Sequence, residues 1–140
     1  MAGENVEIVR AATDAFNRAD VEAWLAHFDS DIVWYAFPEE PEPGPFRGHE
    51  AVRAMAARWM DLFSSFRTEV KEYIEAGEYV LVPARMLGRV PDSDADVVID
   101  EVYVNKCRDG RIVEVRECRT LEEASEAAGL SVQDVLTDSP

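Results

Sequence analysis

Cysteine, basic residues and long hydrophobic runs are all scarce in this sequence of 140 residues. Two cysteines, Cys107 and Cys118, cannot build a disulfide framework, which favours a reducing compartment. No apolar run approaches the ~18 residues that a membrane-spanning helix needs, and the first residues lack the basic and apolar segments of a signal peptide. We therefore expect a cytoplasmic protein with no membrane partner.

The charge is strongly one-sided, with 14 lysines and arginines against 29 aspartates and glutamates and a formal net charge of −15 at pH 7. A surface this acidic repels the phosphates of nucleic acids and of anionic lipids. The charge balance therefore excludes nucleic acid as an expected partner, and it favours solubility.

Motifs for metals and cofactors are also lacking. The run from Asp92 to Asp96 resembles a calcium loop, but Val97 stands where that loop requires glycine and Tyr103 where it requires its last acidic ligand. No Cys or His pair has zinc spacing, and there is no glycine-rich phosphate loop. We expect no metal and no cofactor.

Hydrophobic residues make up 47% of the chain, a share typical of globular proteins. A length of 140 residues is that of one domain with a single core. We predict one domain over 1–140, with loosely ordered tails at 1–4 and 131–140 and a proline-rich loop at 38–47. Helical spacing of apolar residues predicts helices at 5–19, 21–28, 49–63 and 121–130. Alternating patterns and turn residues predict strands at 32–37, 66–75, 78–90, 97–107 and 112–120, and a capping signal predicts a further turn at 131–134. Helices gathered on one face of an antiparallel sheet define the α+β class.

Four stretches at the junctions of these elements carry a family resemblance, namely Ala15–Asp20, Asp31–Trp34, Gly44–His49 and Arg108–Val113. In this order they resemble the SnoaL-like branch of the nuclear transport factor 2-like (ketosteroid isomerase-like) superfamily. The resemblance implies a cone-shaped, cystatin-like fold, in which N-terminal helices pack across the concave face of a curved antiparallel sheet. It also implies a pocket for a small apolar ligand and a homodimer.

The known chemistries of the superfamily match this sequence unequally. Alignment on the first stretch places the tyrosine donor of ketosteroid isomerases at Ala12 and their aspartate base at Ala36, so that constellation is absent. The general base of SnoaL-type polyketide cyclases falls at Glu117, which keeps an acidic group there. The Asp-Arg-Asp set of the epoxide hydrolases is matched only loosely, by Arg85 with Glu101 and Glu117.

The register of the last hairpin decides which carboxylates meet, because a slip of one residue exchanges the two faces of a strand. A three-residue loop ending at Gly110 would pair Glu101 with Glu117. A two-residue loop, Asp109-Gly110, would instead place Glu117 opposite Val102. We favour the three-residue loop.

In both registers Val113 and Val115 share a face with Glu117, which suggests an acid at the edge of an apolar cavity. Burial raises the pKa of a carboxyl, and such a group can transfer protons near neutral pH. The alternative is a structural ion pair of Glu117 with Arg85 or Arg119.

The favoured register adds Glu101 and Tyr103 to Glu117 as candidate catalytic residues, because it turns all three toward the pocket. Asn105 would donate a hydrogen bond to a substrate carbonyl. The remaining candidates for ligand contact are pocket-wall residues and one arginine that needs a partner: Phe16, Trp34, Trp59, Val115 and Arg85.

Two histidines fit structural roles better than catalysis. His49 stands at the expected start of a helix, where a contact with the helix terminus accounts for it, and His27 lies on a polar helix face. Neither needs to be a base.

The sequence thus predicts a cofactor-independent acid/base enzyme, an isomerase, cyclase or dehydratase, acting on a small apolar carbonyl or cyclic compound. A non-catalytic ligand-binding or dimerisation module is the alternative, in which Glu117 and Arg85 neutralise each other. An epoxide hydrolase is a further alternative.

Overall fold

A computed structural model describes residues 3–93 and 95–130, and in these ranges four helices and seven strands follow one another along the chain. The helices and strands are, in order, α1 (Glu4–Asn17), α2 (Val21–Leu25), β1 (Phe28–Tyr35), β2 (Phe46–Arg47), α3 (Gly48–Met60), β3 (Ser65–Val70), β4 (Ile74–Ala76), β5 (Tyr79–Arg89), β6 (Asp96–Arg108), β7 (Arg111–Cys118) and α4 (Leu121–Ala127). The fold is therefore α+β, with the helices and strands in the predicted order. The predicted turn at 131–134 lies outside the described residues.

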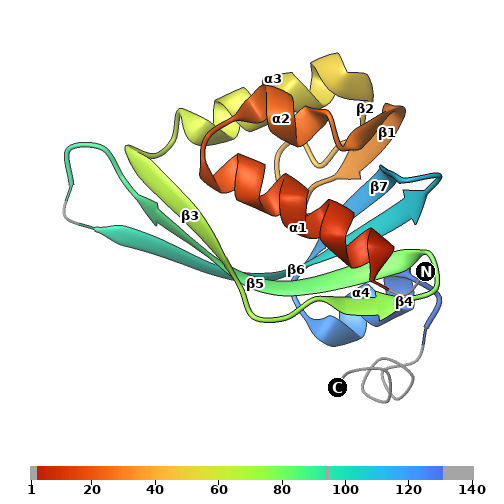
Figure 1. The fold of residues 1–140 in the computed structure, drawn as a ribbon. Coiled ribbons are helices and arrows are strands. Elements are labelled where there is room, and N and C mark those ends of the chain that lie inside the picture. The colour runs from red at the N-terminus through yellow and green to blue at the C-terminus, as the bar shows by residue number, and fades with distance from the viewer. Residues whose placement is uncertain (1–2, 94, 131–140) are drawn as a thin grey trace.

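The strands form one curved, open sheet in the order β2-β1-β7-β6-β5-β3, with β4 beside β5 (Figure 1). The neighbours pair antiparallel except β1 and β7, which run parallel. The sheet is therefore mixed, and the expectation of a wholly antiparallel one misses this pair. No hairpin joins β1 to β7, so no tight turn fixes their relative direction.

Three further differences concern the ends of elements. The strand predicted at 66–75 is divided into β3 and β4, and the short strand β2 occupies the end of the predicted proline-rich loop. Helix α1 begins at Glu4, within the predicted N-terminal tail, and the Gly3 amide donates a hydrogen bond to Glu75 at 2.9 Å.

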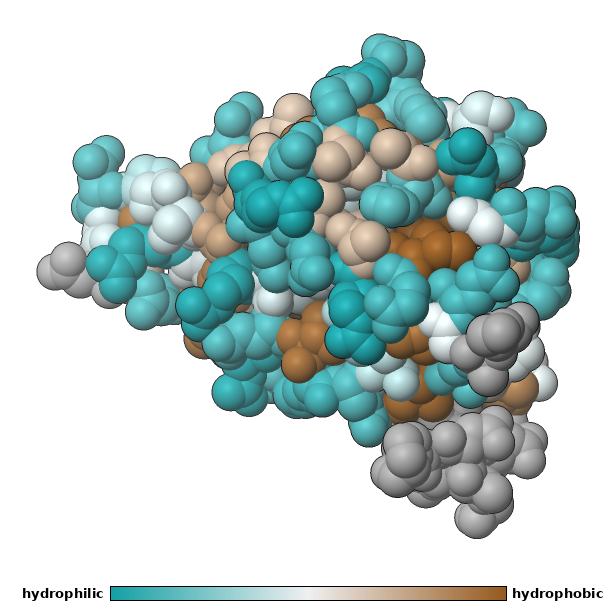
Figure 2. Space-filling view, viewed as in Figure 1, coloured by the Kyte–Doolittle hydropathy of each residue, from teal (hydrophilic) through white to brown (hydrophobic). Residues whose placement is uncertain are grey.

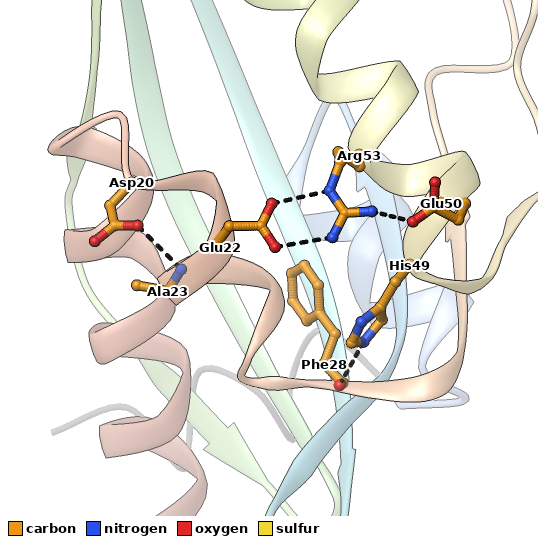
Figure 3. Close-up of polar contacts among 7 residues, drawn as sticks. All are labelled: Asp20, Glu22, Ala23, Phe28, His49, Glu50 and Arg53. Atoms are coloured by element: carbon orange, nitrogen blue, oxygen red, sulfur yellow. Dashed lines mark hydrogen bonds and ion pairs between the residues drawn. The ribbon is translucent and has the colours of Figure 1, made fainter.

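Helices α1, α2 and α3 lie across the concave face of the sheet (Figure 1). Val9, Ala12 and Ala15 form the buried side of α1, as their helical spacing predicts. Asp20 begins α2 by accepting a hydrogen bond from the Ala23 amide at 3.1 Å (Figure 3). One apolar core joins these helices to β1, β5, β6 and β7.

Helix α4 covers part of the opposite face of the sheet. Ala124 packs there with Leu81, Val102 and Val104 in a second, smaller core. The Thr120 side chain begins the helix by accepting a hydrogen bond from the Glu123 amide at 3.1 Å. The alternation along β6 therefore serves two cores, since Val102 and Val104 face α4 and Tyr103 and its alternate neighbours face the other helices.

The hairpin between β6 and β7 has a two-residue turn. Asp109 and Gly110 both have positive φ, 53° and 76°, the geometry in which an Asp-Gly pair follows the twist of its strands. Arg108 pairs with Arg111 across this turn, so the favoured three-residue loop is wrong at this point.

A β-bulge then changes the register of the same hairpin. Beyond Cys107, which pairs with Ile112, the partners shift by one residue, and Asn105 lies opposite Val115. The extra residue, Val113, is only partly buried, while Ile112 and Val115 belong to the main core. Val113 thus does not share the inward face. From Val115 onward the bulge restores the face assignment that a three-residue loop would have given, but Glu117 lies opposite Tyr103, so the predicted pairing with Glu101 is wrong.

Hydrophilic side chains cover most of the surface seen in Figure 2, with hydrophobic residues showing between them. Among the residues that the structure describes, no helix is long and apolar enough to cross a membrane.

Candidate functional site

A cavity of about 500 Å³ lies between the three N-terminal helices and the concave face of the sheet. Its wall is mainly apolar and aromatic, and its polar lining residues are Thr13, Glu40, Glu42, Arg58, Thr68, Tyr103, Asn105 and Glu117. The size and the mixture of many apolar with few polar groups are typical of a small-molecule site.

Glu117 lines this cavity from β7, opposite Tyr103 on β6. Its Oε2 accepts a 2.8 Å hydrogen bond from Nε1 of Trp34, which belongs to the neighbouring strand β1. The indole is buried, with 8% of its surface exposed, so it holds one carboxyl oxygen in place. Glu117 therefore has a fixed position at the wall of the cavity.

Burial raises the pKa of the Glu117 carboxyl from 4.5 to about 8. The charges of Glu101 and Glu40 add to this rise, while the Trp34 hydrogen bond and Arg119 oppose it. With a pKa near neutral pH, Glu117 is available both as a proton donor and as a proton acceptor.

Glu101 lies two residues from Tyr103 along β6 and is buried, at 4% exposure. Burial raises its pKa from 4.5 to about 7, against a hydrogen bond with the Tyr103 side chain and the charge of Arg119. Glu101 is not among the residues that line the cavity, and its hydrogen bond with Tyr103 connects it to a residue that does.

Tyr103 joins the two carboxyl groups, because it hydrogen bonds Glu101 and faces Glu117. Burial and both negative charges raise the pKa of its hydroxyl far above the ordinary value, and a hydrogen bond with Thr68 opposes the rise. Tyr103 therefore stays protonated, and its single O–H, which is donated to Glu101 here, can be donated to a ligand oxygen if it turns away from Glu101.

Four of the other predicted contact residues reach the cavity. Phe16, Trp34 and Trp59 line it, and Asn105 lines it from β6, where its Nδ2 lies 3.4 Å from the Val80 carbonyl oxygen. Val115 is fully buried in the core beside these residues and is not part of the lining.

Arg85 does not approach this site. Its guanidinium is exposed on the opposite face of the sheet and binds Asp100, with Nε 2.9 Å from Oδ1. The proposed pairing of Arg85 with Glu117 is therefore wrong, and so is its predicted contact with a ligand in this cavity. The loosely matched set of an epoxide hydrolase, with Arg85 between Glu101 and Glu117, is not assembled.

His49 stands where the sequence analysis placed it, in the first turn of α3, and its Nε2 lies 2.9 Å from the Phe28 carbonyl oxygen (Figure 3). This contact ties the start of the helix to β1. It leaves His49 in a structural role outside the cavity lining.

Helix α3, which supplies Met55, Ala56 and Trp59 to the cavity wall, is also tied to α2. Arg53 donates two hydrogen bonds to the Glu22 carboxylate, at 2.9 and 2.8 Å, and it also pairs with Glu50 (Figure 3). These three side chains are largely exposed to solvent and do not line the cavity, so they join the two helices and form no part of the candidate site.

Sequence reasoning missed five polar residues of the lining, which are Thr13, Glu40, Glu42, Arg58 and Thr68. Thr68 replaces an apolar residue in the inward alternation of β3, and that replacement was the available signal. Its backbone N–H and C=O bind the Asn17 side chain at the end of α1, at 2.8 and 2.9 Å. Glu40 comes from the proline-rich loop, which carries no periodic pattern.

Gly44 explains how that loop reaches the cavity. A Cβ added at Gly44 would stand 2.8 Å from the Trp34 carbonyl oxygen, so the loop can press against β1 only with glycine there. The Ala36 amide also donates a hydrogen bond to the Pro43 carbonyl at 2.9 Å. The loop closes on β1 and turns Glu40, Pro41 and Glu42 to the cavity rim.

Within 3–93 and 95–130 no group of three or more His, Cys, Asp or Glu side chains could hold a metal ion. The two thiols offer no nucleophile, since burial raises the pKa of both Cys107 and Cys118 to about 11. The chemistry available at the cavity is therefore that of a buried carboxyl with hydrogen-bond donors beside it.

The fold and the cavity define the class, which is that of small α+β proteins with helices closed over a curved sheet around a ligand-sized cavity. Residues 9–115 match the sequence profile of the SnoaL-like domain, and the chain belongs to this family. The matched stretch ends two residues before Glu117. No curated protein shows significant sequence similarity to the chain.

Solved structures confirm the fold. An NTF2-like protein from Burkholderia xenovorans LB400 has 28% identity and a TM-score of 0.70, over 91% of this chain and 97% of its own. TerC, crystallised with polyporic acid, has 21% identity and a TM-score of 0.74, over 88% and 96%. A protein of ketosteroid isomerase-like fold from Catenulispora acidiphila DSM 44928, in complex with trimethylamine, has 17% identity and a TM-score of 0.72, over 91% and 95%.

Proposed function

We propose that this protein is a cofactor-independent acid/base enzyme, an isomerase, cyclase or dehydratase, acting on a small, mostly apolar carbonyl or cyclic compound. The observation that carries the proposal is the Glu117 carboxyl, held by Trp34 at the wall of an apolar cavity of about 500 Å³. Its pKa of about 8 leaves roughly a tenth of the groups ionised at pH 7. Both protonation states are therefore accessible during a reaction.

In the proposed reaction the Glu117 carboxylate takes a proton from a carbon next to the substrate carbonyl. The electron pair of the broken C–H bond moves to the carbonyl oxygen, which accepts a hydrogen bond from the Asn105 amide and one from the Tyr103 hydroxyl, whose single O–H turns from Glu101 to the substrate. Glu117 then returns the proton to a different atom of the substrate. An isomerisation or cyclisation by this route consumes no co-reactant, and a dehydration releases only water.

Glu101 is a positioning residue in this scheme. It hydrogen bonds the Tyr103 side chain and raises the pKa of Glu117, and it does not line the cavity. Replacing Glu101 by Gln removes one negative charge near Glu117. We expect the pH profile of turnover to shift to lower pH, which loss of packing alone would not produce.

The test is a screen of aromatic polyketides, steroids and terpenoid epoxides by thermal shift, followed by turnover assays of the stabilising compounds. Glu117→Gln keeps the size of the side chain and the acceptor for Trp34 but cannot transfer a proton. We expect its kcat to fall at least ~100-fold, the usual scale of general acid–base catalysis. Glu114→Gln is the matched control, since Glu114 lies on the same strand and pairs with Arg116 on the other face of the sheet.

Unchanged turnover in Glu117→Gln would disprove this role. The cavity is also compatible with the second candidate, a non-catalytic ligand-binding module. Compounds that stabilise the protein at micromolar concentration and are never converted would favour that candidate. The hydrogen bond of Glu117 to Trp34, in place of an arginine ion pair, supports the enzyme.

We also propose a homodimer that forms through the outer face of the sheet. Helix α4 covers only part of this face, and Val98 remains 53% exposed there, opposite Leu87 on β5. Sedimentation of monomer alone at tens of micromolar would contradict the dimer, and Val98→Asp should weaken it. Two free cysteines support a reducing location such as the cytoplasm.

A further inference from the structure

The charges around the cavity are mainly negative. Glu117 lies at its wall and Glu40 and Glu42 at its rim. Arg58 is the basic lining residue among those that the structure describes, and its guanidinium is 3.7 Å from Glu42. An anionic ligand would therefore lie close to carboxylates, with no unpaired cation in the described lining to offset the repulsion. Between charges about 4 Å apart in a protein such a repulsion reaches several kcal/mol.

Aromatic rings form much of the remaining wall. They come from both helices and strands and are Phe16, Trp24, Phe28, Trp34, Phe46, Trp59 and Tyr103. The face of an aromatic ring carries negative potential and attracts cations, most strongly where water is excluded. Trp34 and Tyr103, with ring centroids 6.3 Å apart, flank the Glu117 carboxyl from β1 and β6. The carboxyl group and the aromatic rings thus both favour a cationic ligand.

We propose that the natural ligand of this cavity carries a protonated amine on an apolar skeleton, with the ammonium group against Glu117 and the skeleton against the aromatic wall. This inference deepens the proposed function and rests on it only in taking the cavity as the ligand site. A neutral ligand would use the wall but leave Glu117 protonated, so it would gain no ion pair. A carboxylate or phosphate would be repelled.

Binding of such an ammonium group is coupled to proton release. Four ionisable groups face Glu117, namely Glu101 and Tyr103 from β6, Glu40 from the loop and Arg119 beyond β7. Burial and the negative charges of Glu101 and Glu40 hold Glu117 largely protonated at pH 7. The ammonium group binds the ionised form of Glu117, so nearly one proton per ligand is released from Glu117 to the solvent on binding. Affinity then rises about tenfold from pH 6 to 7 and about fivefold from pH 7 to 8, and levels off above pH 8.

The experiment compares three 1-adamantyl compounds that share one rigid skeleton, the methylamine, the methanol and the carboxylate. Titration calorimetry at pH 6, 7 and 8 gives their affinities. Repetition at pH 7 in phosphate and in Tris, which differ in ionisation enthalpy, gives the protons released. We expect the amine to bind at least tenfold tighter than the alcohol at pH 8, with the carboxylate weakest and about one proton released at pH 7.

Glu117→Gln should bring the amine within about threefold of the alcohol and abolish the proton release, whereas Glu114→Gln should behave as the wild type. An alcohol that binds as tightly as the amine, an absence of proton release, or no binding by any of the three overturns the inference. These results leave the proposed function standing if a carbonyl compound is still turned over by Glu117. Conversely, charge selection without turnover would support this inference and contradict the enzyme.

Discussion

Replacing Glu117 by Gln should stabilise the protein at neutral and alkaline pH. The carboxyl has a pKa of about 8 in the folded protein and 4.5 in the unfolded chain. Below pH 4.5 it is neutral in both states and costs nothing. As the pH rises toward 8 the unfolded chain ionises first, so the wild type loses stability over this range and the loss is complete above pH 8.

The size of the effect follows from the two pKa values. Each pH unit between them costs about 1.4 kcal/mol, so the loss at pH 7 is about 3 kcal/mol if the whole shift is realised. Glu117 is only partly buried, and screening by solvent reduces this figure to about 2 kcal/mol. Gln has no charge to bury and keeps an acceptor for the Trp34 N–H, so the variant escapes the cost.

Urea unfolding followed by tryptophan fluorescence at pH 5, 6, 7 and 8 measures the difference. We expect Glu117→Gln to exceed the wild type by less than about 1 kcal/mol at pH 5 and to gain on it steadily as the pH rises. Glu114→Gln corrects for the general effect of removing one acid from so acidic a chain. A Glu117→Gln variant that is no more stable than the wild type at pH 7, with no trend from pH 5 to 8, would refute the reasoning.

Three further predictions concern the frame of the site. Asn17→Ala removes both hydrogen bonds to the Thr68 backbone and should lower the free energy of unfolding by about 1–3 kcal/mol, measured by urea titration; Asn17→Asp, which keeps only the acceptor, should fall between. Gly44→Ala places a methyl group against the Trp34 carbonyl and should lower the melting temperature and weaken ligand binding, whereas Gly77→Ala, with open space around it, should leave binding unchanged. Both cysteines should react with a disulfide reagent far more slowly at pH 8 than a free thiol, because burial raises their pKa to about 11; fast modification of the folded protein would contradict this.

Element types were predictable from the sequence because local patterns determine them. The helical spacing of Val9, Ala12 and Ala15 reflects one buried face, and β5 and β6 are rich in apolar residues because both of their faces are partly covered. The position of β1 beside β7 was not predictable in this way. It depends on packing between segments some eighty residues apart, and periodicity says nothing about partner or direction.

The site was predicted in part, and the reason lies in the last hairpin. The turn type could be read from Asp109-Gly110, but the bulge at Val113 has no signal in the sequence. Tyr103 and Glu117 share a face because the unexpected turn and the unexpected bulge cancel. Arg85 was misplaced because the sequence showed only that it needs a partner on an apolar strand, and not which face of β5 it occupies. Its partner is Asp100, directly opposite on β6, on the outer face.

Because of the bulge at Val113, the direction in which Glu117 points depends on the number of residues between the turn and Glu117 in β7. Deleting a single residue between the turn and Glu117 would rotate every side chain beyond it by half a turn, so that Cys118 or Arg116 would point into the cavity instead. A related chain with one residue fewer in this hairpin would align with a single gap here and present a different group to its ligand, even with a glutamate at the aligned position.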